Sequence, residues 1–143
     1  MLTRVGKVTN IYPETGRVKV IYEDSKSASL PLAMLTMNGE YSMPKIGDRV
    51  VALHLENGSS KGFVIGTYYG GGTLPKANAG YRKDFDEMAY IVCNDGSYLL
   101  KAKDIVLEAG AVTLQCDYGT VTLEELLKRL ERIEEHLALP HMD

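Results

Sequence analysis

The side chains best suited to bind a metal ion or to move a proton are three histidines, scattered along the 143-residue chain. His54 lies in an aliphatic run, His136 in a charged stretch, and His141 in the C-terminal tail. None of them stands at the spacing of a zinc site, where His and Cys ligands recur at short, regular intervals. The sequence therefore predicts no metal site.

The candidate nucleophiles are equally isolated. Ser59 and Ser60 lie in a polar loop without the Gly-x-Ser-x-Gly context of a hydrolase. Cys93 and Cys116 each lie in an apolar, strand-like run, which favours buried free thiols over a disulfide or a metal pair. We therefore expect no catalytic residue, no cofactor and no enzymatic activity.

The composition is that of a folded chain without a strong charge. It is 45% hydrophobic and 24% charged, with a formal net charge of -3. A nucleic-acid-binding protein normally presents a basic face, so we expect no nucleic-acid partner. Met1 leads directly into a strand-like pattern without a long apolar run, so we expect no signal peptide and assembly in the bacterial cytoplasm.

The elements that would hold these side chains begin with five short strands in the first seventy residues. Their apolar patterns cover residues 2–11, 17–22, 28–32, 49–55 and 63–69. Five short antiparallel strands, with a longer connection between the third and the fourth, predict a Greek-key barrel of the OB type. A five-stranded sandwich is the alternative.

Individual residues allow more detailed predictions for parts of this barrel. In the first strand, alternation predicts one face with Val5 and Ile11 and the other with Gly6 and Val8. Gly66, inside the fifth strand, indicates a bulge or a close backbone approach. Three tyrosines are available to stack on bases, although the supporting positive charge is missing: Tyr12, Tyr22 and Tyr41.

A composition shift follows the barrel. Residues 71–87 are rich in small and turn-forming residues and predict a linker. Residues 88–121 then form short strand-like runs, with a turn signal at Asn94-Asp95-Gly96. One side of this stretch is apolar and has no evident partner, so we expect several chains to wind together and bury it. The expected core residues of this β-helix are Ile105, Leu107, Val112, Leu114 and Cys116.

The last element, residues 122–139, is predicted to be a helix. Thr122 and Glu125 have the spacing of a capping box. The apolar residues recur at alternating intervals of three and four, which is typical of a coiled-coil seam, and Arg129 and Glu134 are placed to pair between helices. An amphipathic helix lying on its own domain is the alternative. The seam residues are Leu123, Leu126, Leu130, Ile133 and Leu137.

A resemblance to a known family rests on the fourth and fifth strands. Pro44-x-x-Gly47-Asp48-x-Val50, followed by Gly62-x-Val64-x-Gly66-x-x-Tyr69, resembles the N-terminal OB domain of phage baseplate assembly protein V. This is the central spike family of contractile tails, which is related to the spikes of type VI secretion and of R-type bacteriocins. The resemblance covers residues 1 to about 70, and its motif residues here are Gly47, Asp48, Gly62 and Gly66.

The resemblance implies a function and a set of partners. It implies a homotrimer on the tail axis, attached to baseplate hub and tail tube proteins in a phage or phage-like particle, and driven through the target cell envelope when the sheath contracts. It also implies that the β-helix is a trimeric needle. The sequence departs from the family in having a short β-repeat, a C-terminal helix and no His-x-His motif, which leaves open a separate tip protein.

The sequence thus predicts an all-β fold with a C-terminal helix. Residues 1–70 form the OB-fold domain, 71–87 the linker, 88–121 the trimeric β-helix and 122–139 a coiled-coil-like helix. The structural spike is the preferred function. The alternative is an OB-fold binding module for single-stranded nucleic acid or oligosaccharide, with an oligomerising C-terminal tail.

Overall fold

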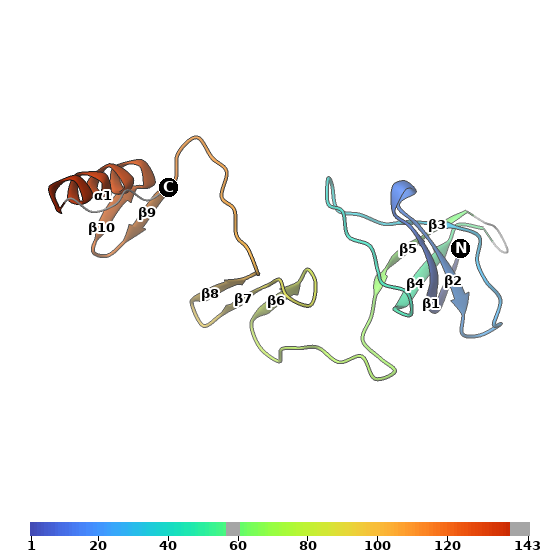
Figure 1. The fold of residues 1–143 in the computed structure, drawn as a ribbon. Coiled ribbons are helices and arrows are strands. Elements are labelled where there is room, and N and C mark those ends of the chain that lie inside the picture. Colours follow the sequence, from blue (N-terminus) through green and yellow to red (C-terminus); the bar gives the residue numbers. More distant parts are fainter. Residues whose placement is uncertain (57–60, 138–143) are drawn as a thin grey trace. The chain divides into compact units, whose positions relative to one another are not determined.

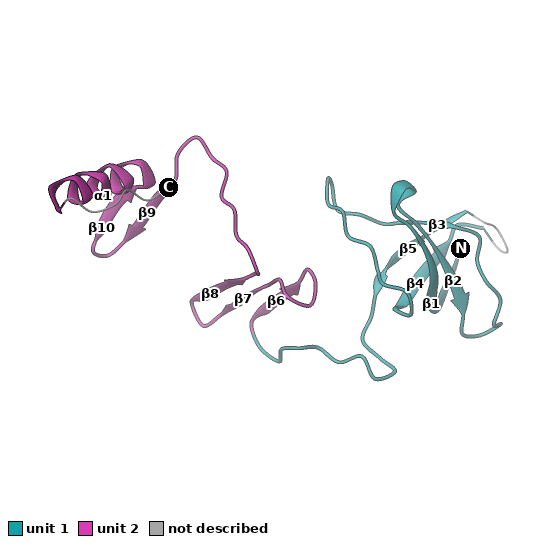
Figure 2. Cartoon of the chain, in the orientation of Figure 1, with its two compact units in different colours: residues 1–79 teal, residues 80–143 magenta. Residues whose placement is uncertain are grey.

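The computed structural model describes residues 1–56 and 61–137, and the chain divides into two compact units at Ala79 and Gly80 (Figure 2). The described residues are mostly β, with a closed barrel in the first unit and one helix near the C-terminus (Figure 1). These features confirm the broad fold class expected from the sequence. Ser59, Ser60, His141 and the expected end of the helix at residue 139 lie outside the described residues.

The first unit is a barrel of five strands. Neighbouring strands pair in the order β1-β2-β3-β5-β4, and β4 returns to β1 to close the barrel. The β3–β5 pair is parallel and the other pairs are antiparallel. Closure excludes the sandwich alternative. The strands are β1 Leu2–Tyr12, β2 Arg17–Tyr22, β3 Leu32–Met34, β4 Arg49–His54 and β5 Gly62–Thr67, with a short 3-10 helix at Pro13–Thr15.

Strand β1 is long enough to pair on both sides. Its first half pairs with β4 and its second half with β2. The register with β2 shifts between Val8 and Asn10, so Thr9 is a bulge. The bulge corrects the expected alternation: Ile11, predicted to lie on the face opposite Val8, packs against the same core as Val8.

The core of the barrel comes from alternate residues of the strands. All five strands contribute fully buried side chains, because their inward positions face the closed interior. Burial of each valine stabilises the fold by about 1.5–3 kcal/mol. The buried residues are Val8, Val18, Val20, Tyr22, Leu32, Val50, Ala52 and Val64.

The third strand is not where the sequence predicted it. Strand β3 covers Leu32–Met34 rather than residues 28–32, and Ala28 makes only an isolated bridge to Ile21. The reason lies in the hydroxyl of Ser29, which accepts a hydrogen bond from the Val20 amide at 2.9 Å. A side chain thus replaces part of the backbone ladder at this point.

The second unit has smaller sheets and one helix. Strands β6, β7 and β8 form one antiparallel sheet, and β9 and β10 form a hairpin that leads directly into α1 (Figure 1). Among its described residues none is buried. The elements are β6 Tyr81–Asp84, β7 Tyr90–Asn94, β8 Ser97–Lys101, β9 Thr113–Cys116, β10 Gly119–Thr122 and α1 Leu123–Leu137.

The stretch expected to be a linker is partly ordered. Residues 71–87 contain β6, whose pairing with β7 was missed because its charged residues hide the strand pattern. The preceding glycines also have a defined role. Gly70 and Thr73 exchange two backbone hydrogen bonds around Gly71 and Gly72, which both have positive φ angles. The glycines therefore form a tight turn that residues with side chains would strain.

Candidate oligomerisation surface

The hairpin and the helix of the second unit form one continuous element. The Thr122 amide donates to the Glu125 carboxylate at 3.3 Å, and the Glu125 amide donates to the Thr122 hydroxyl at 3.2 Å. This reciprocal pair is the predicted capping box, and it confirms the helix start. The Leu123 amide donates to the Val112 carbonyl at 2.8 Å, which ties the first turn of the helix to the start of β9.

The predicted helix seam lies uncovered within the single chain. Leu130 is half-buried, and the other four seam residues are exposed, with fractions from 37% at Leu126 to 58% at Leu137. The charged residues lie mostly on the rest of the helix, where Lys128 and Glu124 form an ion pair of 2.6 Å. That contact lowers the pKa of Glu124 and raises the pKa of Lys128. Within the described residues, the apolar stripe is therefore only partly covered, at Leu130.

The apolar face of the hairpin is also open. The register places Leu114 opposite Val121 and Cys116 opposite Gly119, so these residues share one face. Leu114 is 54% exposed. A cavity of about 370 Å³ opens beside Leu114, Cys116 and Val121, and Arg129 of α1 also lines it. An apolar cavity with a cation at its edge is suited to receive side chains of another polypeptide.

The thiols differ from the sequence prediction. Both cysteines are free, as expected, but Cys93 is half-buried and Cys116 is exposed. The expected burial of the thiols is not seen in the single chain, because among the described residues no other element packs over both faces of the two-stranded hairpin or the three-stranded sheet. Each thiol instead lies on an open apolar surface.

The segment between β8 and β9 carries further uncovered apolar residues. Ile105 and Leu107, expected to alternate along a strand, lie in an extended stretch that belongs to no strand (Figure 1). Their exposed fractions are 54% and 71%, and that of Val106 is 85%. In the described part of the chain, residues 102–111 make no backbone hydrogen bond to one another or to other segments. Their strand pattern lacks a pairing edge within the chain.

In the sheet β6–β7–β8, the sequence predicts the strand-like runs of β7 and β8 but not β6. The tight turn was predicted: β7 and β8 are joined by Asp95 and Gly96, with φ angles of 47° and 73°. These values match a two-residue type I′ hairpin. Strand β6 was missed because three of its four residues are charged: Arg82, Lys83 and Asp84.

Three of the four residues on which the sequence resemblance rests, Gly47, Asp48 and Gly62, have a clear structural role. Gly47 has a φ of 91° and its amide donates to the Val8 carbonyl at 2.8 Å. The Asp48 carboxylate accepts from the Lys45 amide at 2.8 Å, which closes the expected turn. A Cβ on Gly62 would lie 2.3 Å from the Leu53 carbonyl oxygen, so only glycine fits there.

The fourth motif position is less constrained. A Cβ on Gly66 would meet no atom within 4 Å. The register of β4 with β5 shifts here, because Val51 pairs with Gly66 while Ala52 pairs with Val64. Gly66 therefore borders a bulge, as one of the two sequence interpretations predicted, and no close backbone approach requires it.

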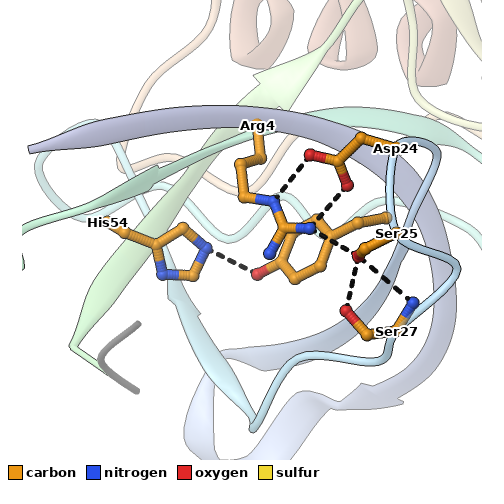
Figure 3. A network of polar contacts seen from close by, with 6 residues as sticks. Arg4, Asp24, Ser25, Ser27 and His54 are labelled. Carbon is orange, nitrogen blue, oxygen red and sulfur yellow. Dashed lines mark hydrogen bonds and ion pairs between the residues drawn. The ribbon is translucent and has the colours of Figure 1, made fainter. Parts of the chain in front are cut away.

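A polar network joins the start of β1 to the loop after β2 (Figure 3). Arg4 donates to both carboxylate oxygens of Asp24 and to the Ser25 hydroxyl, and its guanidinium carbon lies 3.7 Å from the ring centroid of Tyr22. The hydrogen bonds from Arg4 lower the pKa of Asp24, and burial raises the pKa of Tyr22. Tyr22 is only 3% exposed, so the prediction that it could stack on a nucleic-acid base is wrong.

A second cavity lies where β4 begins and β5 ends. It holds about 300 Å³ and is lined by Arg49, Tyr68 and Tyr69, among others. Arg49 is paired with Glu23 at 2.9 Å. A Cβ on Gly71 would lie 2.4 Å from the guanidinium of Arg49, so the glycine turn packs directly on this side chain.

In residues 1–56 and 61–137, no three His, Cys, Asp or Glu side chains gather as metal ligands. No helix within those residues has the length and apolar character needed to span a membrane. A scan against protein-family models and a search of curated proteins both find no match to this chain.

Proposed function

We propose that this chain is the structural central spike of a contractile phage tail or a tail-like injection particle. It acts as a homotrimer, mounted through its barrel on the baseplate hub and tail tube. Sheath contraction drives it through the target cell envelope. The helices of the three copies meet along the seam from Leu123 to Leu137, and the extended segments and hairpins of the three copies, within residues 88–121, wind together into a short needle.

The observation that carries this proposal is the absence of any buried residue among the described residues 80–137. Ordering these residues costs conformational entropy that only burial of apolar surface can offset. Apolar side chains are exposed to solvent on all four elements: the β6–β7–β8 sheet, the extended segment, the β9–β10 hairpin and α1. A partner must therefore cover four consecutive elements, and copies of the same chain do so without further components.

The charges beside the seam favour identical copies over a different partner. Arg129 and Glu134 flank the stripe on opposite sides, five residues apart. In parallel helices, positions with this spacing lie across the interface from one another. Each copy thus offers a cation to the carboxylate of the next, and the pattern closes on itself in a cyclic assembly.

The barrel supports the mounting role through the residues that resemble the spike family. Gly47 and Asp48 form a tight turn against β1, and Gly62 allows β4 and β5 to approach closely. These are backbone roles that stiffen a closed barrel, as a part under mechanical load requires. The alternative binding module is less well supported because Tyr22, one of its expected stacking residues, is buried in the core.

Light scattering of the purified full chain tests the oligomer. We expect a mass three times the 15.8 kDa of the chain, unchanged on dilution to low micromolar concentration. A monomer at all concentrations would contradict the spike. A single-stranded oligonucleotide that is retained at low salt and released steeply with added salt would instead favour the binding module.

The particle assignment needs its own measurement. Tail-like particles purified from cells that produce this chain should carry it at the baseplate, where an antibody against the barrel would label it by electron microscopy. Deleting the chain should leave particles whose sheaths contract without penetrating target cells. Particles that lack the chain but retain full killing or infectivity would contradict the assignment.

A further inference from the structure

The three-stranded sheet β6–β7–β8 has two faces of different chemistry. Its register aligns Tyr81, Cys93 and Tyr98 in one row across the strands. Residues directly opposite one another share a face, and neighbours along a strand alternate. One face, called here the tyrosine face, consists of Tyr81, Lys83, Ile91, Cys93, Tyr98 and Leu100.

The opposite face, called here the arginine face, is internally paired. The Arg82 guanidinium donates to the Asp84 carboxylate at 2.8 Å and lies 4.0 Å from the ring centroid of Tyr90. The Lys101 ammonium lies 5.6 Å from the same centroid. The hydrogen bond to Asp84 raises the pKa of Arg82. The face consists of Arg82, Asp84, Tyr90, Val92, Leu99 and Lys101.

The two faces differ in how far their side chains are satisfied within the single chain. The charges of the arginine face have partners within the chain, so this face is stable in contact with water. The tyrosine face exposes 55% of Tyr81, 64% of Tyr98 and 44% of Leu100. A small antiparallel sheet gains independent stability only when an apolar face is covered.

Symmetry decides which face copies of the chain can share. Around a rotation axis, a residue near the centre meets its own copies. Arg82 or Lys101 at that position would place like charges together, which costs binding energy. Tyrosine, isoleucine and cysteine carry no such penalty, and tyrosine is enriched at interfaces. Lys83 is the one charged member of the tyrosine face, whereas the arginine face has three, Arg82, Asp84 and Lys101, so fewer charges meet their own copies when the tyrosine face is shared.

We propose that the tyrosine face of β6–β7–β8 is a contact surface between copies of this chain, with the arginine face turned to solvent. This inference rests on the proposed homotrimer and extends its contact to Tyr81–Lys101, before the extended segment, the hairpin and the helix. Strand β6 then begins the trimeric part of the protein, although it lies within residues 71–87, which the sequence predicts to be a linker; β7 and β8 lie within the predicted β-helix at residues 88–121.

Two adjacent positions on β8 provide a matched test. Tyr98 and Leu99 lie on opposite faces, yet both are well exposed in the single chain, at 64% and 50%. Tyr98→Cys and Leu99→Cys are made separately in the full chain with Cys93→Ser and Cys116→Ser. Each variant is labelled with a polyethylene-glycol maleimide, natively and in denaturant. We expect the native thiol of Tyr98→Cys to react at least about tenfold more slowly than that of Leu99→Cys, and both to react equally in denaturant.

Light scattering of the same samples separates the possible results. A trimer in which both thiols react at the same rate, or in which Leu99→Cys is the protected one, would overturn the face assignment and leave the trimer standing. A monomer in both variants and in the parent chain would overturn both proposals. A Tyr98→Cys variant that alone loses the trimer supports the assignment, and the native Cys93 in a Cys116→Ser chain then gives a second protection measurement on the same face.

Discussion

The Tyr22 hydroxyl lies 2.6 Å from the Nε2 atom of His54 in the interior of the barrel, and the two rings meet edge to face with centroids 5.5 Å apart. Tyr22 ends β2 and His54 ends β4, two strands that do not pair with each other but both pair with β1. The hydrogen bond therefore connects strands that the sheet ladder leaves unconnected. Both side chains are buried, at 3% and 7% exposed.

Replacing this hydroxyl should destabilise the barrel. Tyr22→Phe keeps the ring but takes the hydroxyl away from a buried nitrogen, and we expect a loss of about 1–3 kcal/mol in the free energy of unfolding. Urea denaturation followed by circular dichroism measures it. Tyr12→Phe, at a partly exposed position on β1, is the control and should change stability little. Equal midpoints for both variants would show that the bond to His54 contributes nothing.

The contact between Arg4 and Asp24 predicts an acid dependence of stability. The hydrogen bonds from Arg4 lower the pKa of Asp24 in the folded state. A lowered carboxyl pKa gives stability that is present above the unfolded-state pKa and is lost as pH falls through the folded-state pKa. The melting temperature should therefore fall in acid, and Asp24→Asn should reduce that dependence below about pH 4. Because Asp24 is exposed, the effect should be small and should weaken with salt.

That prediction has a direct control. Asp95→Asn changes another exposed carboxylate, in the turn between β7 and β8, and leaves the Arg4 contact intact. Its acid profile should match that of the parent chain. If the profiles of Asp24→Asn and the parent coincide as well, Arg4 does not stabilise the barrel through this carboxylate.

Glycines in the barrel should differ in their tolerance of a methyl group. A Cβ on Gly6 would lie 2.3 Å from the Ile21 carbonyl oxygen, and one on Gly62 equally close to the Leu53 carbonyl oxygen. We expect Gly6→Ala and Gly62→Ala each to cost more than about 1 kcal/mol because backbone must move. Gly66→Ala meets open space and should stay within about 0.5 kcal/mol.

Thermal melts of the three glycine variants measure these differences. The comparison also separates the two glycines of β5, since packing requires Gly62 and does not require Gly66. A destabilised Gly66→Ala with an unaffected Gly62→Ala would contradict the geometry of the β4–β5 pair.

A charge placed on the apolar face of α1 should disrupt the oligomer, whereas a charge on its polar face should not. Leu130 is the most buried residue of the stripe, so Leu130→Asp would bury a carboxylate among apolar side chains if the helices associate. We expect the oligomer to dissociate or to lose its C-terminal structure, seen as a lower mass in light scattering and a reduced helical signal. Arg132→Asp, on the polar side of the same helix, should leave the mass unchanged. An unchanged mass in Leu130→Asp would exclude the seam as an oligomer contact.

Much of the local structure could be predicted from the sequence because the signals are short-range. The capping box at Thr122 and Glu125, the hairpin turn at Asp95-Gly96 and the turn at Gly47-Asp48 each depend on a few neighbouring residues, and all three are present. Four barrel strands were also located closely, because apolar residues alternate wherever one face of a strand points into a core.

Contacts between distant segments explain why the predictions for β3, for the alternation of β1 and for β6 were wrong or missing. The hydroxyl of Ser29, and not a backbone carbonyl, accepts the hydrogen bond from the Val20 amide of β2, so β3 begins later than its apolar pattern suggests. The bulge at Thr9 depends on the register with β2, which no residue of β1 specifies alone. Charged residues hide β6, whose pairing with β7 becomes evident only in three dimensions.

The sequence by itself determined which residues are apolar, where the chain turns and where the helix begins, because these depend on side-chain chemistry and neighbours along the chain. Only the tertiary structure decided which apolar residues find a core. Closure of the barrel buries one inward-facing set of apolar residues, which includes Val8, Val20, Val50 and Val64, whereas no described residue beyond Gly80 is buried within the single chain. The physical reason is that burial depends on the surface available to cover a residue, and a closed barrel provides this surface while small open sheets and a single helix do not.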